Sequence, residues 1–297
     1  PAKEVWRVSE DGELRDPFKK LTTVFQMSEE MFFLHYGKDG CNRHVLIDEC
    51  RELFGEIYEQ IPELPFCNIW TAMQLSSRLP KGALFHMGVS NTRRCWNMFQ
   101  LPESVESACN VGCCGIDGCV STLVGASLVN PDRLCYVVVG DLTFFYDLNS
   151  LGNHHIGTNL RVMLVNNGRG TEFRLGIHHC NVFGDDADKY MAAAGHFGNK
   201  SPLLVKHYAE DLGFHYLSAT TKEEFMTALS NFTNPQLSDH SMILEVFTDS
   251  KDESEALYLM SHIQSDAKGM VRSKLKDAVR NVAGEKGINA IKKILKK

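Results

Sequence analysis

The chain of 297 residues contains no uninterrupted apolar run of the length that a membrane-spanning helix needs, about 18 residues. Its first residues do not pair a basic segment with an apolar one, as a secretory signal peptide does. Excess positive charge is also lacking, because 31 Lys and Arg against 37 Asp and Glu give a net charge of −6. This balance argues against a dedicated nucleic-acid-binding protein. We expect a soluble, cytoplasmic protein with one large α/β domain and additions to it, and we consider membrane association unlikely.

Paired metal-binding cysteines are missing as well, although the chain has ten Cys residues. Cys109, Cys113, Cys114 and Cys119 lie close together, but their spacing does not form the two CxxC pairs of a zinc or iron–sulfur site. The neighbours of most cysteines are apolar. We therefore predict reduced, packed cysteines, which suits a cytoplasmic location.

The first 65 residues hold too little apolar sequence for a core of their own. Val5–Val8 and Thr22–Phe25 are strand-like and are joined through the turn-forming pair Asp11-Gly12. Residues 37–42 are typical of a linker, and apolar residues at helical spacing predict a helix over residues 47–61. Because the chain opens at Pro1 directly into a strand, we expect residues 1–38 to be the end of a domain that begins elsewhere.

From about residue 66, apolar runs alternate with amphipathic segments. Leu134–Val139 and Arg161–Val165 are continuous apolar strands, as expected in a parallel sheet covered on both faces. Further strands are predicted at 83–87 and 242–247, and helices at 67–79, 117–129, 142–151, 201–212 and 222–229. The alternation predicts an α/β fold, a doubly wound, mainly parallel sheet with helices on both faces and ligands at the carboxyl ends of its strands.

Two of these strands end in polar residues. Leu134–Val139 runs into Gly140 and Asp141, and Arg161–Val165 runs into Asn166 and Asn167. Each sequence alone is a common turn, but neighbouring parallel strands would bring the Asp141 carboxylate and the Asn167 amide together. These oxygens suit Mg²⁺. The backbone amides of Leu142 and Thr143 open a predicted helix and would point at an anion, so the pair of strand ends suits a magnesium diphosphate.

The spacing of these residues resembles a family signature. Gly140-Asp141-Leu142, separated by 23 intervening residues from Asn166-Asn167, is similar to the signature of thiamine-diphosphate enzymes. Longer matches at residues 110–122 and 140–149 are similar to the branch of 2-succinyl-5-enolpyruvyl-6-hydroxy-3-cyclohexene-1-carboxylate synthases of menaquinone biosynthesis. The resemblance covers residues 64–249. Residues 6–34 show a weaker similarity to that family's central domain.

The resemblance implies a role for each matching residue. The implied cofactor-binding residues are Gly115, Ile116, Gly140, Leu142, Thr143 and Asn167, with Ile116 as the apolar wedge that bends the cofactor. The implied Mg²⁺ ligands are Asp141, Asn167 and the backbone carbonyl of Arg169. Ser90 and Arg94 fall where the family holds a substrate carboxylate.

The same resemblance implies a division into domains. Residues 1–38 would be a remnant of the central domain, 39–65 a linker and helix, and 66–260 the diphosphate-binding domain. Residues 261–297 would be a basic amphipathic tail, for which we prefer docking onto an acidic protein surface to binding a membrane.

Some positions depart from the family. Val111 stands where a second carboxylate-binding Arg is expected, and Cys113 and Cys114 replace small residues before Ile116. The metal turn is followed by Arg174, His178, His179 and Cys180 instead of an apolar lid. These changes suit a less anionic or differently shaped acceptor. Residues 181–200, which follow that turn, have the composition of a lid.

The activating Glu of the family belongs to a separate pyrimidine-binding domain, and no residue before position 66 fits it. We therefore assign no catalytic residue to this chain and expect it to be inactive alone. The missing domain would come from the same gene or another subunit, in a homodimer or tetramer.

The predicted function is Mg²⁺- and thiamine-diphosphate-dependent decarboxylation of a 2-oxo acid, with transfer of the acyl unit to a small-molecule acceptor. Alternatives are a related decarboxylase or synthase of another pathway, and a non-catalytic cofactor-binding subunit. A dinucleotide-binding domain is a further alternative, since Gly168-Arg169-Gly170 follows a strand, but Phe173 stands where the third glycine is required.

Overall fold

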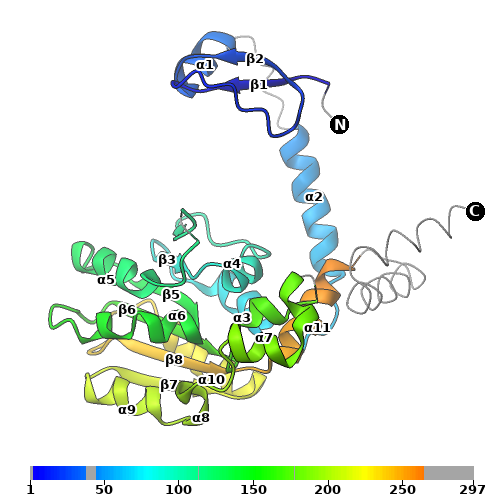
Figure 1. Cartoon of the computed structure of the whole chain (residues 1–297). Coiled ribbons are helices and arrows are strands. Elements are labelled where there is room, and N and C mark those ends of the chain that lie inside the picture. Colours follow the sequence, from blue (N-terminus) through cyan, green and yellow to red (C-terminus); the bar gives the residue numbers. More distant parts are fainter. Residues whose placement is uncertain (1–2, 38–44, 113, 177, 264–297) are drawn as a thin grey trace, which may run out of the picture. The chain divides into compact units, whose positions relative to one another are not determined.

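The computed structural model describes residues 3–37, 45–112, 114–176 and 178–263 (Figure 1). The chain divides into two compact units, Pro1–Glu59 and Gln60–Lys297. The basic tail lies outside the described residues from position 264 onward, as does most of the predicted linker. Within the described residues, no helix combines the length and the apolar character needed to cross a membrane.

The smaller unit is held together by aromatic side chains. It contains β1 (Val5–Val8), β2 (Leu21–Phe25), α1 (Glu29–Tyr36) and α2 (Val45–Glu59). Trp6, Phe25, Phe32 and Tyr36 pack with ring centroids 4.8–5.5 Å apart. Both strands were predicted, but they pair in parallel, so Asp11-Gly12 does not close a hairpin between them. Asp11 instead accepts two hydrogen bonds from Arg7, at 2.6 and 2.9 Å.

The larger unit is built on a six-stranded sheet in the order β4-β3-β5-β6-β8-β7, in which all paired strands are parallel. The strands are β3 (Leu84–Met87), β4 (Glu106–Cys109), β5 (Cys135–Gly140), β6 (Leu160–Asn166), β7 (His215–Ala219) and β8 (Met242–Phe247). This confirms the predicted α/β sheet and its parallel direction. β4 and β7 were not predicted.

Helices connect these strands and cover both faces of the sheet (Figure 1). They are α3 (Asn68–Leu75), α4 (Asn91–Trp96), α5 (Cys119–Val129), α6 (Asp141–Tyr146), α7 (Asp185–Tyr190), α8 (Phe197–Lys200), α9 (Leu204–Asp211), α10 (Lys222–Phe232) and α11 (Ser250–Ser261). Short 3₁₀ segments are η1 (Ser76–Arg78), η2 (Leu148–Gly152), η3 (Thr171–Arg174) and η4 (His179–Phe183). The predicted helix over 142–151 is thus divided into α6 and η2.

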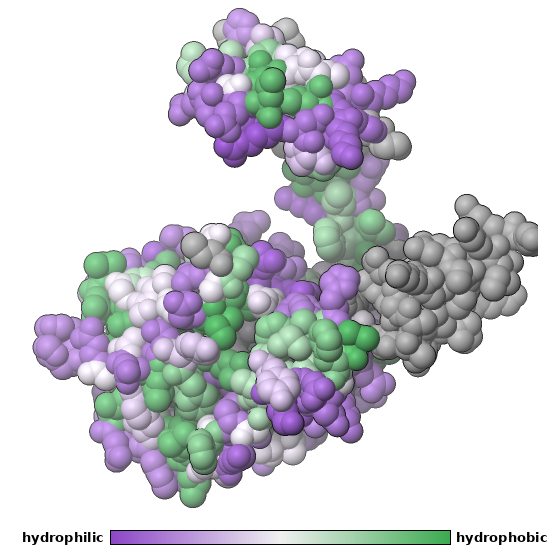
Figure 2. Space-filling model, in the orientation of Figure 1, coloured by the Kyte–Doolittle hydropathy of each residue, from purple (hydrophilic) through white to green (hydrophobic). Residues whose placement is uncertain are grey.

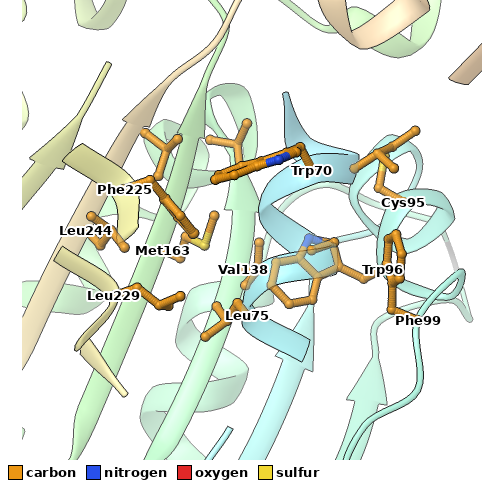
Figure 3. Packing of buried hydrophobic residues seen from close by; sticks show 14 of the residues in the cluster. Trp70, Leu75, Cys95, Trp96, Phe99, Val138, Met163, Phe225, Leu229 and Leu244 are labelled. Atoms are coloured by element: carbon orange, nitrogen blue, oxygen red, sulfur yellow. The ribbon is translucent and has the colours of Figure 1, made fainter. Parts of the chain in front are cut away.

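The alternation of side chains along the strands produces two cores. Cys135, Val137 and Val139 of β5 pack with α5 and α9, whereas Tyr136 and Val138 of the same strand pack with the opposite layer. Figure 3 shows that second core, where the two indoles of α3 and α4 lie beside side chains from the strands and from α10. Burial of both faces explains why β5 and the middle of β6 are apolar.

The order of the strands places a crevice at one point of the sheet. The chain runs from β3 outward to β4, then returns to the other side of β3 to form β5 and continues to β6. The segments that leave the carboxyl ends of β3 and β5 therefore diverge. In an open parallel sheet this is where a ligand binds.

The surface of the larger unit is mixed in polarity. On the face shown in Figure 2, hydrophobic and hydrophilic residues alternate over the described part of this unit. The eight described cysteines are all free thiols, and burial raises the pKa of Cys67 to about 12 and that of Cys135 to about 11.

A buried carboxyl group joins α11 to α3. Glu253 Oε1 accepts hydrogen bonds from the Asn68 backbone amide at 3.0 Å and from the Thr248 hydroxyl at 2.7 Å. Burial raises the pKa of Glu253 from 4.5 to about 7, and these hydrogen bonds only partly oppose the rise. In the native protein the carboxyl group therefore keeps its proton to a higher pH than in the unfolded chain.

This shift predicts a pH-dependent stability that Glu253→Gln removes. Between about pH 4.5 and pH 7 the unfolded chain loses the Glu253 proton while the native state retains it, so the free energy of unfolding falls as pH rises through this window. The loss is on the order of 3 kcal/mol and is complete above the folded pKa.

Urea unfolding of both proteins at several values from pH 5 to pH 8 measures this difference. Glu255→Gln, an exposed position on the same helix, serves as the control and keeps the wild-type profile. A Glu253→Gln variant with the same pH profile as the wild type would contradict the assignment.

Candidate functional site

A cavity of about 290 Å³ lies at the crevice between the ends of β3 and β5. Eight of the ten residues implied by the family resemblance line it, namely Ser90, Ile116, Gly140, Asp141, Leu142, Thr143, Asn167 and Arg169. Gly115 and Arg94 are not among the lining residues. The carboxyl ends of β3, β5 and β6 thus contribute to one cavity. From the sequence, the residues after β5 and β6 were expected to lie close together.

Asp141 is almost completely buried and already has two partners. Its Oδ1 accepts a hydrogen bond from the Leu142 backbone amide at 2.9 Å, and its Oδ2 lies 2.8 Å from His196 Nε2. The Leu142 backbone amide was expected to point at a bound anion, but it donates its hydrogen bond to the Asp141 carboxylate. His196, the residue that caps α8, was not predicted to reach this site.

Asn166 anchors the end of β6 from inside the sheet. Its Nδ2 donates to Glu245 Oε1 at 2.7 Å and to the Gly198 carbonyl oxygen at 3.1 Å. Glu245 Oε2 accepts from the Tyr216 hydroxyl at 2.7 Å. Burial raises the pKa of Glu245, and the hydrogen bonds from Asn166 and Tyr216 partly oppose the rise. Asn166 and Glu245 are both buried, and the hydrogen bond between them provides a partner for a polar atom of each.

Asn167 presents an oxygen that has no partner in the described chain. Its Oδ1 is buried, lacks a hydrogen bond, and belongs to a residue that lines the cavity. An interaction with the Asn167 side chain lowers the pKa of Glu253 and opposes the larger effect of burial.

The oxygen atoms of Asp141 and Asn167 fit a hard divalent cation. Among the described residues, no group of three or more His, Cys, Asp or Glu side chains is arranged to hold a metal ion. A cation at this edge would therefore need amide and backbone oxygens in addition to one carboxylate. The unpartnered Asn167 Oδ1 is the observation that fits this requirement.

The two arginines of the predicted site are paired with carboxylates. Arg94 Nη1 and Nη2 donate to Glu172 at 2.6 and 2.9 Å. Arg169 Nη1 donates to both oxygens of Asp188 at 2.9 Å. The hydrogen bond with Glu172 raises the pKa of Arg94. Arg94 was predicted to hold a substrate carboxylate. In this structure both terminal nitrogens of its guanidinium donate to Glu172 of the same chain.

Ser90 adopts a backbone conformation that side chains rarely take. It precedes α4 with φ 61° and ψ −123°, outside the left-handed helical region. Such residues persist where the surrounding structure holds them, and they concentrate at functional sites. Ser90 lines the cavity, so the turn from β3 into α4 is held against this strain.

Several residues of the site were missed from sequence. They are Glu172, Asp188, His196, Glu245 and Glu253. Glu245 offered a signal, because it interrupts an apolar run that was correctly predicted as a strand. Glu253 lies in the regular helix α11, and the other three lie in or beside short helical segments; none of these segments has a pattern that places the residue at the cavity.

The fold and the cavity together define an α/β protein of the doubly wound, ligand-binding class. Comparison with protein-family models gives no match. Among curated proteins, the chain is 33% identical over 263 residues to a 2-succinyl-5-enolpyruvyl-6-hydroxy-3-cyclohexene-1-carboxylate synthase of Bacteroides fragilis, covering 86% of this chain and 45% of that protein. The synthase of Phocaeicola vulgatus is 32% identical over 265 residues, with coverages of 86% and 44%.

A further synthase of this name, from Christiangramia forsetii, is 33% identical over 199 residues and matches 67% of this chain and 33% of its own length. Over 86% of its length the chain is thus similar to 2-succinyl-5-enolpyruvyl-6-hydroxy-3-cyclohexene-1-carboxylate synthases, which are thiamine-diphosphate enzymes, as the cofactor motifs implied. It spans a little under half the length of the first relatives it matches.

The packing of α8 against α6 predicts that Gly198→Ala disturbs the site. A Cβ atom at Gly198 would overlap the ring of Phe145, which packs on His196 with centroids 5.4 Å apart. We expect a loss of about 1–3 kcal/mol in the free energy of unfolding. Gly125→Ala in α5 is the matched control, because no atom lies within 4 Å of the added Cβ, and it should not destabilise the protein. Equal stabilities of the two variants in urea would refute the packing argument.

Proposed function

We propose that this chain forms the diphosphate-binding half of an Mg²⁺- and thiamine-diphosphate-dependent synthase. The enzyme would decarboxylate a 2-oxo acid and transfer the acyl unit to a small-molecule acceptor, in the menaquinone pathway that its relatives' family serves. The observation that carries this proposal is the meeting of Asp141 and Asn167 at one cavity, with Asn167 Oδ1 buried and unpartnered.

Asp141, Asn167 and the backbone carbonyl of Arg169 would hold Mg²⁺, and Thr143 would lie beneath the diphosphate. Ile116, which lines the same cavity, would support the bend of the cofactor together with Gly115. When bound, thiamine diphosphate supplies the electron sink that decarboxylation of a 2-oxo acid requires. The chain's own part is to orient the diphosphate end, through oxygen ligands fixed by Asn166, Glu245 and Glu253.

The activating Glu would come from a pyrimidine-binding domain, in the same gene or in another subunit. This division agrees with the coverage, since the chain accounts for 45% of the Bacteroides fragilis relative. A homodimer or tetramer would then complete each site. Residues 1–38 would belong to a central domain, and the chain alone would be inactive.

A related decarboxylase or synthase of another pathway is the second candidate. Two observations favour it. Val111 offers no charge where a second carboxylate-binding Arg was expected, and it is 42% exposed. The remaining Arg94 is already paired with Glu172.

Cofactor binding is tested by thermal unfolding of the chain with Mg²⁺ and thiamine diphosphate. At a ligand concentration 100-fold above Kd, stabilisation should reach about 2.7 kcal/mol. Asp141→Asn should abolish this gain because it removes the one carboxylate from the oxygen set.

Asp211→Asn, at an exposed position that ends α9, is the control and should retain the full stabilisation. The proposal fails if Mg²⁺ and thiamine diphosphate leave the wild-type melting temperature unchanged. A shift with NAD instead would support the dinucleotide-binding alternative.

A further inference from the structure

The loop that leads from β4 to Ile116 carries two described thiols beside the cavity. Cys109 is the last residue of β4, and Cys114 lies two positions before Ile116. Cys114 and Ile116 both line the cavity, whereas Cys109 is not among the lining residues. The proposed function gives neither thiol a role.

Two hydrogen bonds fold this loop back on itself. The Val111 backbone amide donates to the Cys109 carbonyl oxygen at 2.8 Å, and the Cys114 thiol donates to the Val111 carbonyl oxygen at 3.3 Å. Both cysteines are thus attached to the same residue. Burial raises the pKa of the Cys109 thiol, and the electrostatic effect of Cys114 adds to the rise. The two thiols are therefore neighbours in space as well as in the sequence.

Cys114 is held in a backbone conformation that favours glycine. Its φ is 53°, in the left-handed region, which is unfavourable for a residue with a Cβ atom. Strain of this kind concentrates at functional sites and switch regions. Its relief favours a rearrangement of the loop once the thiol forms a new bond.

Exposure assigns different roles to the two thiols. Cys114 is exposed, so an oxidant in solution reaches it, whereas Cys109 is half-buried. Among the described residues, no group of three or more His, Cys, Asp or Glu side chains is arranged to hold a metal ion, so these two thiols do not belong to such a cluster. An accessible thiol beside a second, resolving cysteine is the arrangement of a redox-sensitive site.

We propose that Cys109 and Cys114 form a redox modification site, in which hydrogen peroxide converts the two thiols into a disulfide that withdraws Ile116 from the cavity. The Cys114 thiolate attacks one oxygen of the peroxide, the O–O bond breaks, one water leaves, and Cys114 becomes a sulfenic acid. The Cys109 thiolate then attacks that sulfur, so the S–S bond forms and the S–O bond breaks with loss of a second water. Two thiols are oxidised, and one peroxide is reduced to two waters.

The disulfide acts on the cofactor site because the connection is short. Only Gly115 lies between Cys114 and Ile116, so a movement of Cys114 toward Cys109 is passed on to Ile116. A disulfide requires Cα atoms within about 7 Å of each other and a fixed dihedral angle, which restricts the loop further. This effect rests on the proposed function, in which Ile116 supports the bend of the cofactor. The formation of the disulfide does not rest on it.

Mass spectrometry of the full chain tests the disulfide. The reduced, folded protein is treated with hydrogen peroxide, free thiols are alkylated, and peptides are mapped without reduction. The wild type should lose the mass of two hydrogen atoms and link Cys109 to Cys114, reversibly with dithiothreitol. Cys109→Ser should instead retain a sulfenic acid on Cys114, which dimedone labels. Cys50→Ser, at an exposed thiol outside this loop, and Cys113→Ser are the controls and should keep the disulfide.

Isothermal titration calorimetry with Mg²⁺ and thiamine diphosphate tests the effect on the cofactor. The oxidised protein should bind about tenfold more weakly than the reduced protein, because the disulfide distorts the loop that carries Ile116. Dithiothreitol should restore the affinity. Cys109→Ser, whose substitution lies outside the cavity lining, should bind before oxidation as the reduced wild type does.

Three results would overturn the proposal. Peroxide leaves Cys109 and Cys114 free in the folded protein, the disulfide joins Cys114 to a cysteine other than Cys109, or the oxidised and reduced proteins bind the cofactor equally. A reduced protein that binds no cofactor refutes the proposed function, and with it the effect on Ile116, while a mapped Cys109–Cys114 disulfide still supports the modification site.

Discussion

The buried hydrogen bond between Asn166 and Glu245 fixes the part of the sheet on which the site depends. Both side chains are removed from water, so each would lose considerable free energy without the other. The bond joins the carboxyl end of β6 to β8, and a second bond from Asn166 to the Gly198 carbonyl attaches α8. The direction in which Asn167 leaves the strand follows from these constraints, as does the position of His196 beside Asp141.

The site neutralises its own charges, and it does so in two different ways. Glu245 and Glu253 lie behind the strand ends, where burial raises the pKa of each and where asparagines donate to them. Arg94 and Arg169 instead form ion pairs with Glu172 and Asp188 at the edge of the cavity. The first arrangement leaves an amide oxygen available to a cation, and the second leaves little positive charge available to an anion. A metal ion, and not an arginine, would have to balance a bound diphosphate.

The central part of the fold could be predicted because two simple rules apply to it. Continuous apolar runs identified β5 and β6, and parallel pairing placed the residues after them at one edge. β4 has only one aliphatic residue, and β7 is a partly exposed edge strand, so neither has the pattern of a buried strand. The parallel pairing of β1 with β2 could not be predicted from the sequence, because the intervening Asp11-Gly12 is typical of a hairpin turn between antiparallel strands.

The partners of the predicted site residues could not be found in this way. Glu172 is 78 residues from Arg94, His196 is 55 from Asp141, and Asn166 is 79 from Glu245. Local patterns determine which residues follow a strand, but only the packed fold determines which side chains meet them. The sequence therefore placed Asp141 and Asn167 at the ends of neighbouring strands, but it did not reveal Glu172 as the partner of Arg94.

The difference between these two outcomes has a physical cause. A cofactor's metal and diphosphate require oxygens at fixed positions on strand ends. The sequence motif that supplies these oxygens therefore also determines where they lie. An arginine side chain can donate hydrogen bonds to any carboxylate that lies within reach, whether that carboxylate belongs to a substrate or to the protein. One glutamate on a short segment such as η3 can therefore change the ligand of Arg94 while Asp141 and Asn167 stay where they are.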